Sequence, residues 1–496
     1  MAVLTFEQAL ELADRHWTSG QFGPAEALCR QILANHPQHA GALHQLGLVA
    51  ASTGHYQAAV ELMSQAIALS PAHAVYHTNL GEICRRLDRH EEAIACFHRA
   101  LQLGAEFPET HTNLGAALTG AGRFEEAIAC YHRALELRPD GADTHVNFGV
   151  ALAELGRHAE ATASFQKALI HKPELGEAHW NLALMLLLLE HYEEGWAEFE
   201  WRWRKERYTS PKRNFNVPQW NGLRADGRTI LLHAEQGFGD ALQFLRYVPA
   251  VRSRAGAEKV ILECHPELAR LLALGGDWDA EIIARGSWDG SALPPFDLHL
   301  PLLSLPFALK TGAPPLMSGP YLISDPDIRK LWRARLSRDP AIRVGLAWAG
   351  SPAHKNDRSR SIDFERLLPI LGVPGVSFHS LQAGSRDLQS QARSGAGLMD
   401  WTAHITDFAD TAALMAELDL IITVDTATAH LAGALGKPVW TLLPFVPDWR
   451  WGLEKEDTPW YPGMRLFRQP RVGDWESVIR RVAGELRALQ AASPGN

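Results

Sequence analysis

The first part of this 496-residue chain repeats itself, and no other feature of the sequence restricts its fold as strongly. A small residue recurs every 34 positions, in the series Ala25, Ala59, Ala93, Ala127, Ala161 and Gly195. A second series consists of Ala66, Ala100, Ala134 and Ala168, and prolines close four repeats at Pro37, Pro71, Pro139 and Pro173. Small residues at a fixed register allow two helices to cross closely, so each period predicts one helix pair. Such pairs bury their apolar faces by stacking on their neighbours, which predicts an α-solenoid.

These repeats resemble the tetratricopeptide family. The first helix of successive pairs is marked by Leu46-Gly47, Leu80-Gly81, Leu114-Gly115 and Phe148-Gly149, and an aromatic residue follows the first small-residue series at Phe97, Tyr131 and Phe165. We expect six repeats with degenerate terminal members, beginning near Phe6, Ala40, Ala74, Pro108, Ala142 and Gly176. The resemblance implies a right-handed superhelix whose concave face binds peptide.

Two polar ladders run along the predicted first helices. Just ahead of the Leu-Gly position, and following Gln45, stand Asn79, Asn113, Asn147 and Asn181. We predict that these amides bind an extended acceptor peptide, as in the eukaryotic protein O-linked N-acetylglucosamine transferase, which the repeats resemble. Alternatively, asparagine is simply common at this position in such repeats. Two residues earlier stand His77, His111, His145 and His179. We favour a structural role for them, because a spacing of one repeat does not converge ligands on a metal.

Composition and charge argue against several classes of protein. The net charge of −9, from 48 basic and 57 acidic residues, is unlike that of a nucleic-acid binder. The longest apolar run, residues 182–189, is far shorter than the ~20 residues of a membrane span. The five cysteines include no CxxC pair, which argues against a zinc site or a disulfide framework. We therefore expect a cytoplasmic protein with no metal, no cofactor, no nucleic-acid partner and no integral membrane association.

An aromatic and arginine-rich segment, residues 192–207, ends the repeats. Trp196, Trp201 and Trp203 are too many large aromatic residues for a solvated cap, so we expect this segment to dock the repeats onto the C-terminal part of the chain. Its basic residues, Arg202 among them, are expected to form a solvated face.

Strands and helices alternate in the rest of the chain. Apolar runs predict strands at 229–234, 259–264, 342–348, 376–381 and 420–424, which is the pattern of parallel, doubly wound sheets. The predicted fold is α + α/β. Residues 1–207 are predicted to form the repeat solenoid, 208–228 a linker, 229–330 a first Rossmann-like lobe and 331–496 a second.

The segment 424–438 is a candidate anion site. A buried strand ends at Val424, and small residues from Thr426 open a helix that Gly436 and Pro438 close. Free N–H groups and the helix dipole favour a diphosphate at such a helix start. Any crossover in a parallel sheet has a similar pattern, so the fragment alone leaves both interpretations open.

Five segments together resemble the bacterial tetratricopeptide-repeat glycosyltransferases, whose catalytic half is similar to the heptosyltransferases of glycosyltransferase family 9. They are residues 234–247, 297–306, 344–350, 358–361 and 424–438. The resemblance implies a GT-B catalytic region of two facing lobes, with a last helix from 475 to 489 that runs back across the junction. It also implies an inverting, metal-independent transfer of sugar from a nucleotide-diphosphate donor to a protein or peptide acceptor recruited by the repeats.

The resemblance assigns roles to single residues. Asp240, after Gly239, corresponds to the catalytic base, with Glu235 and His233 as alternates; otherwise Asp240 merely caps the helix that begins there. The expected donor-binding residues are Arg360, Asp425, Thr426, Ala427, Thr428, Ala429 and His430, with Lys355 and Arg358 as substitutes for Arg360. Arg360 would neutralise the departing diphosphate. The aromatic segments 448–451 and 460–461 would wall the nucleoside or simply pack.

Two other functions are compatible with the sequence. In the first, the catalytic half is inactive and the chain is a repeat scaffold for protein–protein interaction. In the second, the chain is a glycosyltransferase whose acceptor is a glycan or lipid. The donor is also open, because the heptosyltransferase resemblance suggests an ADP-linked sugar and the repeats suggest UDP-N-acetylglucosamine.

Overall fold

The computed structural model describes residues 5–206, 208–276, 278–286, 293–312, 319–336, 342–354, 356–382 and 397–492. The chain divides into two compact units, Met1–Asn181 and Leu182–Asn496. Within the described ranges, every helix is too short or too polar to cross a membrane.

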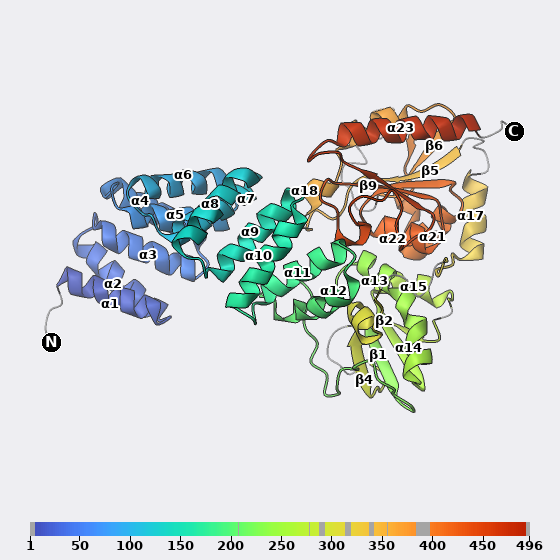
Figure 1. Cartoon of the computed structure of the whole chain (residues 1–496), viewed down its shortest axis with the longest axis horizontal. Coiled ribbons are helices and arrows are strands. Elements are labelled where there is room, and N and C mark those ends of the chain that lie inside the picture. Colours follow the sequence, from blue (N-terminus) through green and yellow to red (C-terminus); the bar gives the residue numbers. More distant parts are fainter. Residues whose placement is uncertain are drawn as a thin grey trace. The chain divides into compact units, whose positions relative to one another are not determined.

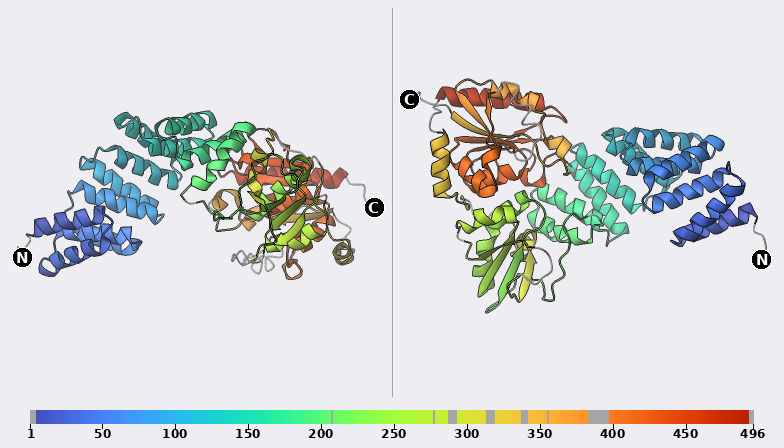
Figure 2. Two further views of the ribbon diagram at one scale, coloured as in Figure 1. Left: turned by 90° about the horizontal axis from the view of Figure 1, so that it is seen from below. Right: turned by 180° about the vertical axis from the view of Figure 1, so that it is seen from behind.

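The N-terminal unit is an α-solenoid of stacked helix pairs (Figures 1 and 2). The first helices of the pairs are α1 (Phe6–Thr18), α3 (Ala40–Ser52), α5 (Ala74–Arg86), α7 (Pro108–Gly120) and α9 (Ala142–Glu154). The second helices are α2 (Phe22–Asn35), α4 (Tyr56–Leu69), α6 (His90–Gln102), α8 (Phe124–Leu137) and α10 (His158–His171). A sixth first helix, α11 (Gly176–Leu188), spans the division between the units. All six predicted repeat starts coincide with the first residue of a helix.

Glycine and aromatic residues explain the close crossing within the pairs α5–α6, α7–α8 and α9–α10. A Cβ at Gly81 would lie 2.9 Å from Cε1 of Phe97, and at Gly149 it would lie 2.5 Å from Cε1 of Phe165. Both rings are almost fully buried, so the repeated Leu-Gly and the repeated aromatic form a single contact.

The segment after the repeats packs within the C-terminal unit. Trp196, on α12 (Tyr192–Phe199), contacts the rings of Phe244 and Trp449 at centroid distances of 5.8 and 5.3 Å. Arg202, on the 3-10 helix η1 (Glu200–Arg204), is fully buried, so the expectation that it belongs to a solvated face is wrong. Its burial is tolerated because the carboxylates of Glu200 and Glu235 both lie 2.7 Å from its guanidinium.

The first α/β region holds a four-stranded parallel sheet in the order β3-β2-β1-β4. Its strands are β1 (Thr229–His233), β2 (Lys259–Cys264), β3 (Glu281–Ala284) and β4 (Leu298–Pro301). Its helices are α13 (Phe238–Phe244), η2 (Leu245–Tyr247), α14 (Val248–Ala255), α15 (Pro266–Ala273), η3 (Leu302–Ser304) and α16 (Leu305–Ala308), and α17 (Pro326–Leu336) follows. The strand order reverses between β1 and β4, because β2 and β3 lie on one side of β1 and β4 lies on the other. α13 begins just beyond β1.

The second α/β region holds a six-stranded parallel sheet in the order β10-β9-β8-β5-β6-β7. Its strands are β5 (Ile342–Ala347), β6 (Val376–Ser380), β7 (Leu398–Met399), β8 (Leu420–Val424), β9 (Val439–Leu443) and β10 (Met464–Arg468). Its helices are α18 (Asp357–Arg360), η4 (Phe364–Leu367), α19 (Leu368–Leu371), η5 (Thr402–His404), α21 (Phe408–Ala416), α22 (Ala427–Ala434), η6 (Trp449–Trp451) and α23 (Trp475–Ala492). Numbered along the chain, these strands have the doubly wound order 3-2-1-4-5-6.

The last helix differs from the expectation. Figure 1 shows α23 along one face of the second sheet, opposite α21 and α22. Its buried residues, Val478, Ile479 and Val482 among them, pack into the core formed by Val344 and Ile370 of the same region. The apolar face of α23 thus covers its own sheet, whereas we expected it to run back across the junction.

Candidate functional site

The candidate site lies where the strand order of the second sheet reverses. β5 and β8 are neighbours there, with Val344 paired to Leu420 and Ala347 to Thr423. The chain leaves β5 toward Gly350 and α18, and it leaves β8 toward Asp425 and α22. In open parallel sheets, ligands bind in the crevice at such a reversal, beyond the carboxyl ends of the strands.

Arg360 and Asp425 meet at this point. Arg360 Nη1 donates a hydrogen bond to the backbone carbonyl of Asp425 at 3.1 Å. Gly350 lets the guanidinium pass, because a Cβ there would lie 2.6 Å from Arg360 Nη2. Ser361 steadies the loop by accepting the Gly350 N–H (3.0 Å) and donating to Asp357 (2.8 Å). The substitute Lys355 lies outside the described residues.

The start of α22 presents backbone donors. Thr426 is the N-cap residue in an extended conformation, and its side chain makes no capping hydrogen bond. The N–H of Ala429 already donates to the Thr426 carbonyl at 3.0 Å. Within the described part of the chain, the N–H groups of Ala427 and Thr428 donate to no other residue. Of the predicted donors, these two are therefore placed to bind an anion.

His430 has a structural position. Its side chain is 4% exposed, its ring lies 5.4 Å from that of Trp451, and its Nδ1 is 2.9 Å from the hydroxyl of Tyr461. Burial, together with the charges of Arg450 and Arg246, holds the pKa of His430 well below its usual value. The ring is therefore neutral and packed, and it cannot contribute a positive charge to a ligand.

Gly239 brings the first α/β region against α22. A Cβ at this position would lie 2.9 Å from Cδ2 of His430 and 3.6 Å from Cα of Ala427. α13 and α22 therefore touch where both helices begin. The glycine before Asp240 is required by this contact.

Asp240 performs two tasks at that crossing. Its Oδ2 accepts the N–H of Gly237 at 3.1 Å, which caps α13 as the alternative interpretation of the sequence predicted. Its Oδ1 forms an ion pair with Nη2 of Arg450, in the second region. A quarter of the side chain remains exposed. The Asp240 carboxylate can therefore cap α13 and still be reached by a ligand.

Sequence reasoning missed Arg450. Its guanidinium pairs with Asp240 and with Asp448, the latter at 2.8 Å, and it donates to Gln243. The aromatic residues of the segment 448–451 predict a wall for the nucleoside or simple packing, and they say nothing about the arginine between them. The separation of 210 positions between Arg450 and Asp240 leaves no local pattern that would have identified the pair.

The charges around the site affect how its groups titrate. Burial, followed by the negative charge of Asp448, raises the pKa of Asp425 to about 6, although Arg450 and Arg360 partly offset this. Burial and the charge of Arg360 lower the pKa of His354.

The two alternate bases are bound to buried partners. Glu235 is 3% exposed and accepts from Arg202 (2.7 Å) and from the hydroxyl of Tyr208 (3.1 Å). His233 is equally buried, and its Nε2 lies 3.2 Å from Nδ1 of His299. Asp240, with its partly exposed carboxylate, is the best placed of the three candidates.

The asparagine ladder divides into two pairs. Asn79 Nδ2 lies 2.9 Å from Nε2 of His44, and Asn181 Nδ2 donates to the Glu177 carbonyl at 2.9 Å. Asn113 and Asn147 are half-buried, and their side-chain amides bond to no other described residue. These two amides are the ones available to a ligand.

The histidine ladder closes the repeats. Nε2 of His77, His145 and His179 lies 3.0, 3.1 and 2.8 Å from the carbonyl of Pro71, Pro139 and Pro173, respectively. Where Ala105 replaces the proline, His111 contacts Glu106 instead, at 3.0 Å. This pattern agrees with the structural role that we favoured.

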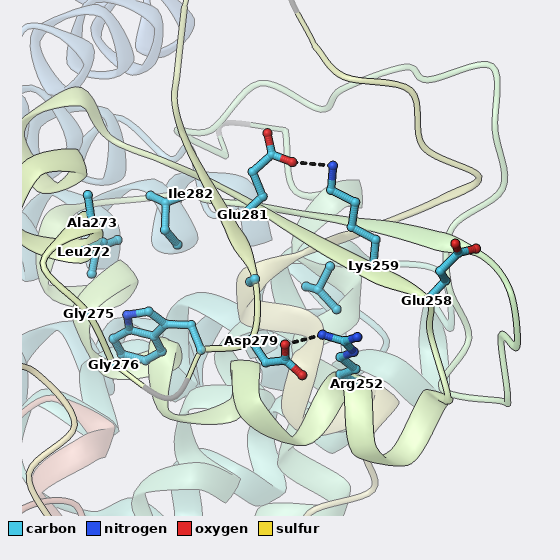
Figure 3. Close-up of a pocket in the computed structure, with 13 residues that line it drawn as sticks. Arg252, Glu258, Lys259, Leu272, Ala273, Gly275, Gly276, Asp279, Glu281 and Ile282 are labelled. Carbon is cyan, nitrogen blue, oxygen red and sulfur yellow. Dashed lines mark hydrogen bonds and ion pairs between the residues drawn. The ribbon is translucent and has the colours of Figure 1, made fainter.

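A cavity of about 430 Å³ lies elsewhere, beside the amino ends of β2 and β3 (Figure 3). Four of the charged side chains around it form two ion pairs, Arg252 with Asp279 and Lys259 with Glu281. Because it lies at the opposite end of the strands from Asp240, it is separate from the candidate site.

Models of known protein families match segments in both the N-terminal and the C-terminal part of the chain. Tetratricopeptide-repeat models match residues 10–74, 44–108 and 106–169, and the model of glycosyltransferase family 9 (heptosyltransferase) matches residues 401–453. The latter segment contains Asp425, α22 and Arg450.

One curated relative and two proteins of known structure are similar to parts of this chain. Protein FlbA of Caulobacter vibrioides is 28% identical over 322 residues, which are 60% of this chain and 52% of FlbA. The chain thus spans about half the length of this relative. MamA from Desulfovibrio magneticus RS-1 is 19% identical and covers 34% of this chain and 96% of its own, with a TM-score of 0.32. The tetratricopeptide-repeat protein TTC0263 of Thermus thermophilus is 23% identical and covers 37% and 100%, also with a TM-score of 0.32. The chain is thus similar to tetratricopeptide-repeat proteins over residues 10–169 and to glycosyltransferase family 9 (heptosyltransferase) over residues 401–453.

Proposed function

We propose that this chain is a GT-B glycosyltransferase that moves a sugar from a nucleotide-diphosphate donor to a protein or peptide acceptor. The observation that carries the proposal is the meeting of Arg360, Asp425 and the start of α22 at the strand-order reversal, where α13, the helix of Asp240, packs against α22 at Gly239. The match of residues 401–453 to glycosyltransferase family 9 supports the same conclusion.

The donor's diphosphate would bind at the start of α22. The N–H groups of Ala427 and Thr428 and the hydroxyls of Thr426 and Thr428 supply hydrogen-bond donors, and the helix dipole favours negative charge. Arg360 adds a guanidinium from the opposite loop. A cation and a helix start can together stabilise the charge of the leaving group, so we propose a metal-independent reaction.

Asp240 would act as the general base. The acceptor O–H bond breaks as its proton moves to the carboxylate, and the acceptor oxygen forms a bond to the anomeric carbon. The bond from that carbon to the diphosphate oxygen breaks, and its electron pair leaves with the diphosphate. A single displacement of this kind inverts the configuration of the anomeric carbon.

The repeats would recruit the acceptor. Asn113 and Asn147 each offer an unengaged amide that can donate to and accept from a peptide backbone. Recognition of backbone groups suits a transferase with several protein acceptors.

The direct test compares wild type with Asp240→Asn. UDP-N-acetylglucosamine and ADP-heptose serve as donor probes, and release of nucleoside diphosphate measures turnover. We expect a loss of roughly 10²- to 10⁴-fold in the variant. Unchanged turnover would remove Asp240 from the mechanism.

Donor binding can be tested independently of turnover. Thermal stabilisation by either nucleotide sugar should be weaker in Arg360→Met and retained in Asp240→Asn. If neither probe stabilises the wild type, the result favours the inactive scaffold.

A further inference from the structure

Arg450 joins the two α/β regions at the candidate site. Its Nη2 pairs with Asp240 on α13, its Nη1 lies 2.8 Å from Asp448 on its own loop, and its Nε donates to Gln243. Only 10% of its side chain is exposed. We propose that Arg450 is a positioning residue that holds the carboxylate of Asp240 in the orientation needed for proton transfer, an inference that rests on the proposed function.

Two contacts fix the plane of the Asp240 carboxylate. Oδ2 is held by the N–H of Gly237 and Oδ1 by Arg450. Each carboxylate oxygen has a second lone pair, which remains for the acceptor hydroxyl. The terminal torsion of aspartate is broad, so loss of Arg450 would leave one oxygen free to rotate. Proton transfer is sensitive to such small displacements.

Asp448 allows Arg450 to stay buried while Asp240 changes its charge. Burial alone lowers the pKa of Arg450, but the carboxylates of Asp448 and Asp240 raise it above the usual value, so the guanidinium is a permanent cation. When Asp240 takes up the acceptor's proton, its negative charge disappears. Asp448 then remains as the counter-ion, and no buried cation is left unpaired.

Arg450 acts through Asp240 and forms no bond during the transfer. Three of its N–H groups are engaged by Asp240, Asp448 and Gln243, none of which belongs to the predicted donor-binding set. The diphosphate has its own partners in Arg360 and the start of α22. Loss of Arg450 should therefore affect the rate of the chemical step more than the binding of the donor.

A double-mutant cycle on the full chain tests this inference. Initial rates of nucleotide-sugar turnover are measured, with UDP-N-acetylglucosamine and ADP-heptose as probes, for wild type, Arg450→Met, Asp240→Asn and the double variant. We expect kcat of Arg450→Met to fall by about 100-fold, with little change in the KM for the donor. The double variant should be no slower than Asp240→Asn, because Arg450 acts through that carboxylate.

Two further variants separate positioning from folding. Arg450→Lys keeps the charge but cannot bridge two carboxylates and Gln243, so it should recover only part of the rate; it replaces Arg450→Met in the cycle if circular dichroism shows the latter to be unfolded. Arg465, which pairs with Glu485 on α23 at 3.0 Å, provides the matched control. Losses from Arg465→Met and Asp240→Asn should multiply.

Several outcomes would overturn the inference. A raised KM with unchanged kcat would make Arg450 a donor ligand, and multiplying losses for Arg450→Met and Asp240→Asn would make the two residues independent. Unaltered kinetics in Arg450→Met, with an active wild type, would reject the inference alone. A wild type that turns over neither probe would reject the proposed function and this inference with it.

Discussion

At Gly239 an added methyl group would meet the ring of His430, which is itself held by Trp451 and Tyr461. Gly239→Ala should therefore lower the free energy of unfolding by ~1–3 kcal/mol, the usual cost of overpacking. Gly237→Ala is the matched control, because its Cβ would be 3.5 Å from Asp240 Oδ2, an ordinary contact. Urea denaturation of both variants checks the difference, and equal stabilities would show that α13 and α22 are not in contact.

The raised pKa of Asp425 predicts that donor binding depends on pH. Below about pH 6 the carboxyl is protonated and neutral, and above it a negative charge appears beside the proposed diphosphate site. The affinity for a nucleotide sugar, whose diphosphate keeps its charge over this range, should therefore weaken as the pH rises through about 6. We expect a change on the order of tenfold between pH 5 and pH 7, measured by calorimetry.

Asp425→Asn isolates this effect. The variant should bind the same nucleotide sugar with an affinity that varies less with pH. If the affinity of the variant varies with pH as much as that of the wild type, a group other than Asp425 titrates in this range. His354 would then be the next residue to examine.

A site residue can be predicted from the sequence when it belongs to a short motif. It cannot be predicted when its role depends on a contact with a residue far away in the chain. Asp240 and Arg360 belong to short motifs, so the family resemblance is enough to propose them as site residues. Arg450 and Asp448 became visible only when folding placed Arg450 beside Asp240. Glu235 carries the same chemistry as Asp240, but its partner Arg202 comes from a different part of the chain, and only the structure shows that the pair is buried.

Among the elements, η1 carries the most consequential side chain outside the site. Arg202 bonds to Glu235, at the end of the strand before α13, and to Ser304 in the 3-10 helix after β4. Arg202→Met would leave buried carboxylates without their cation, so we expect a loss of ~3–5 kcal/mol in the free energy of unfolding. Chemical denaturation measures this loss.

Arg204 provides the comparison for Arg202. It lies on the same 3-10 helix, but its side chain is exposed and rests on the ring of Trp201. Arg204→Met should change the free energy of unfolding by no more than about 0.5 kcal/mol. Similar effects for both substitutions would contradict a special role of the buried network.

Predictability also differed among the elements. The repeat starts were correct because period, small residues and prolines all report on local helix packing. The strand at Leu420–Val424 was correct because a short apolar run before a helix has few other interpretations. The path of α23 was wrong, because its apolar face indicates that it packs but does not say on what. The domain boundaries at 207, 228 and 330 stay predictions.

For the whole molecule, the proposed link between repeats and catalysis makes a prediction about the acceptor. Asn113→Ala with Asn147→Ala should slow modification of a protein acceptor by about tenfold, from ~0.7 kcal/mol for each lost amide contact. Donor hydrolysis in the absence of acceptor should be unchanged. Both rates can be followed with a radiolabelled nucleotide sugar.

Lys167→Ala is the control for this pair of substitutions, because Lys167 is exposed on α10, a second helix, whereas the asparagines lie on first helices. If the control and the double variant slow modification equally, the asparagines have no special part in acceptor binding. If neither has an effect, a glycan or lipid acceptor becomes the better hypothesis.

The pairing of β5 with β8 has a consequence for how the chain reaches its native state. Val344 of β5 pairs with Leu420 of β8, although β6 and β7 come between these strands in the sequence. The centre of the second sheet therefore cannot form until the ribosome has synthesised β8. The helix pairs of the repeats need only neighbouring sequence. Because local contacts form faster than distant ones, the solenoid is expected to fold on the ribosome well before the two parallel sheets close.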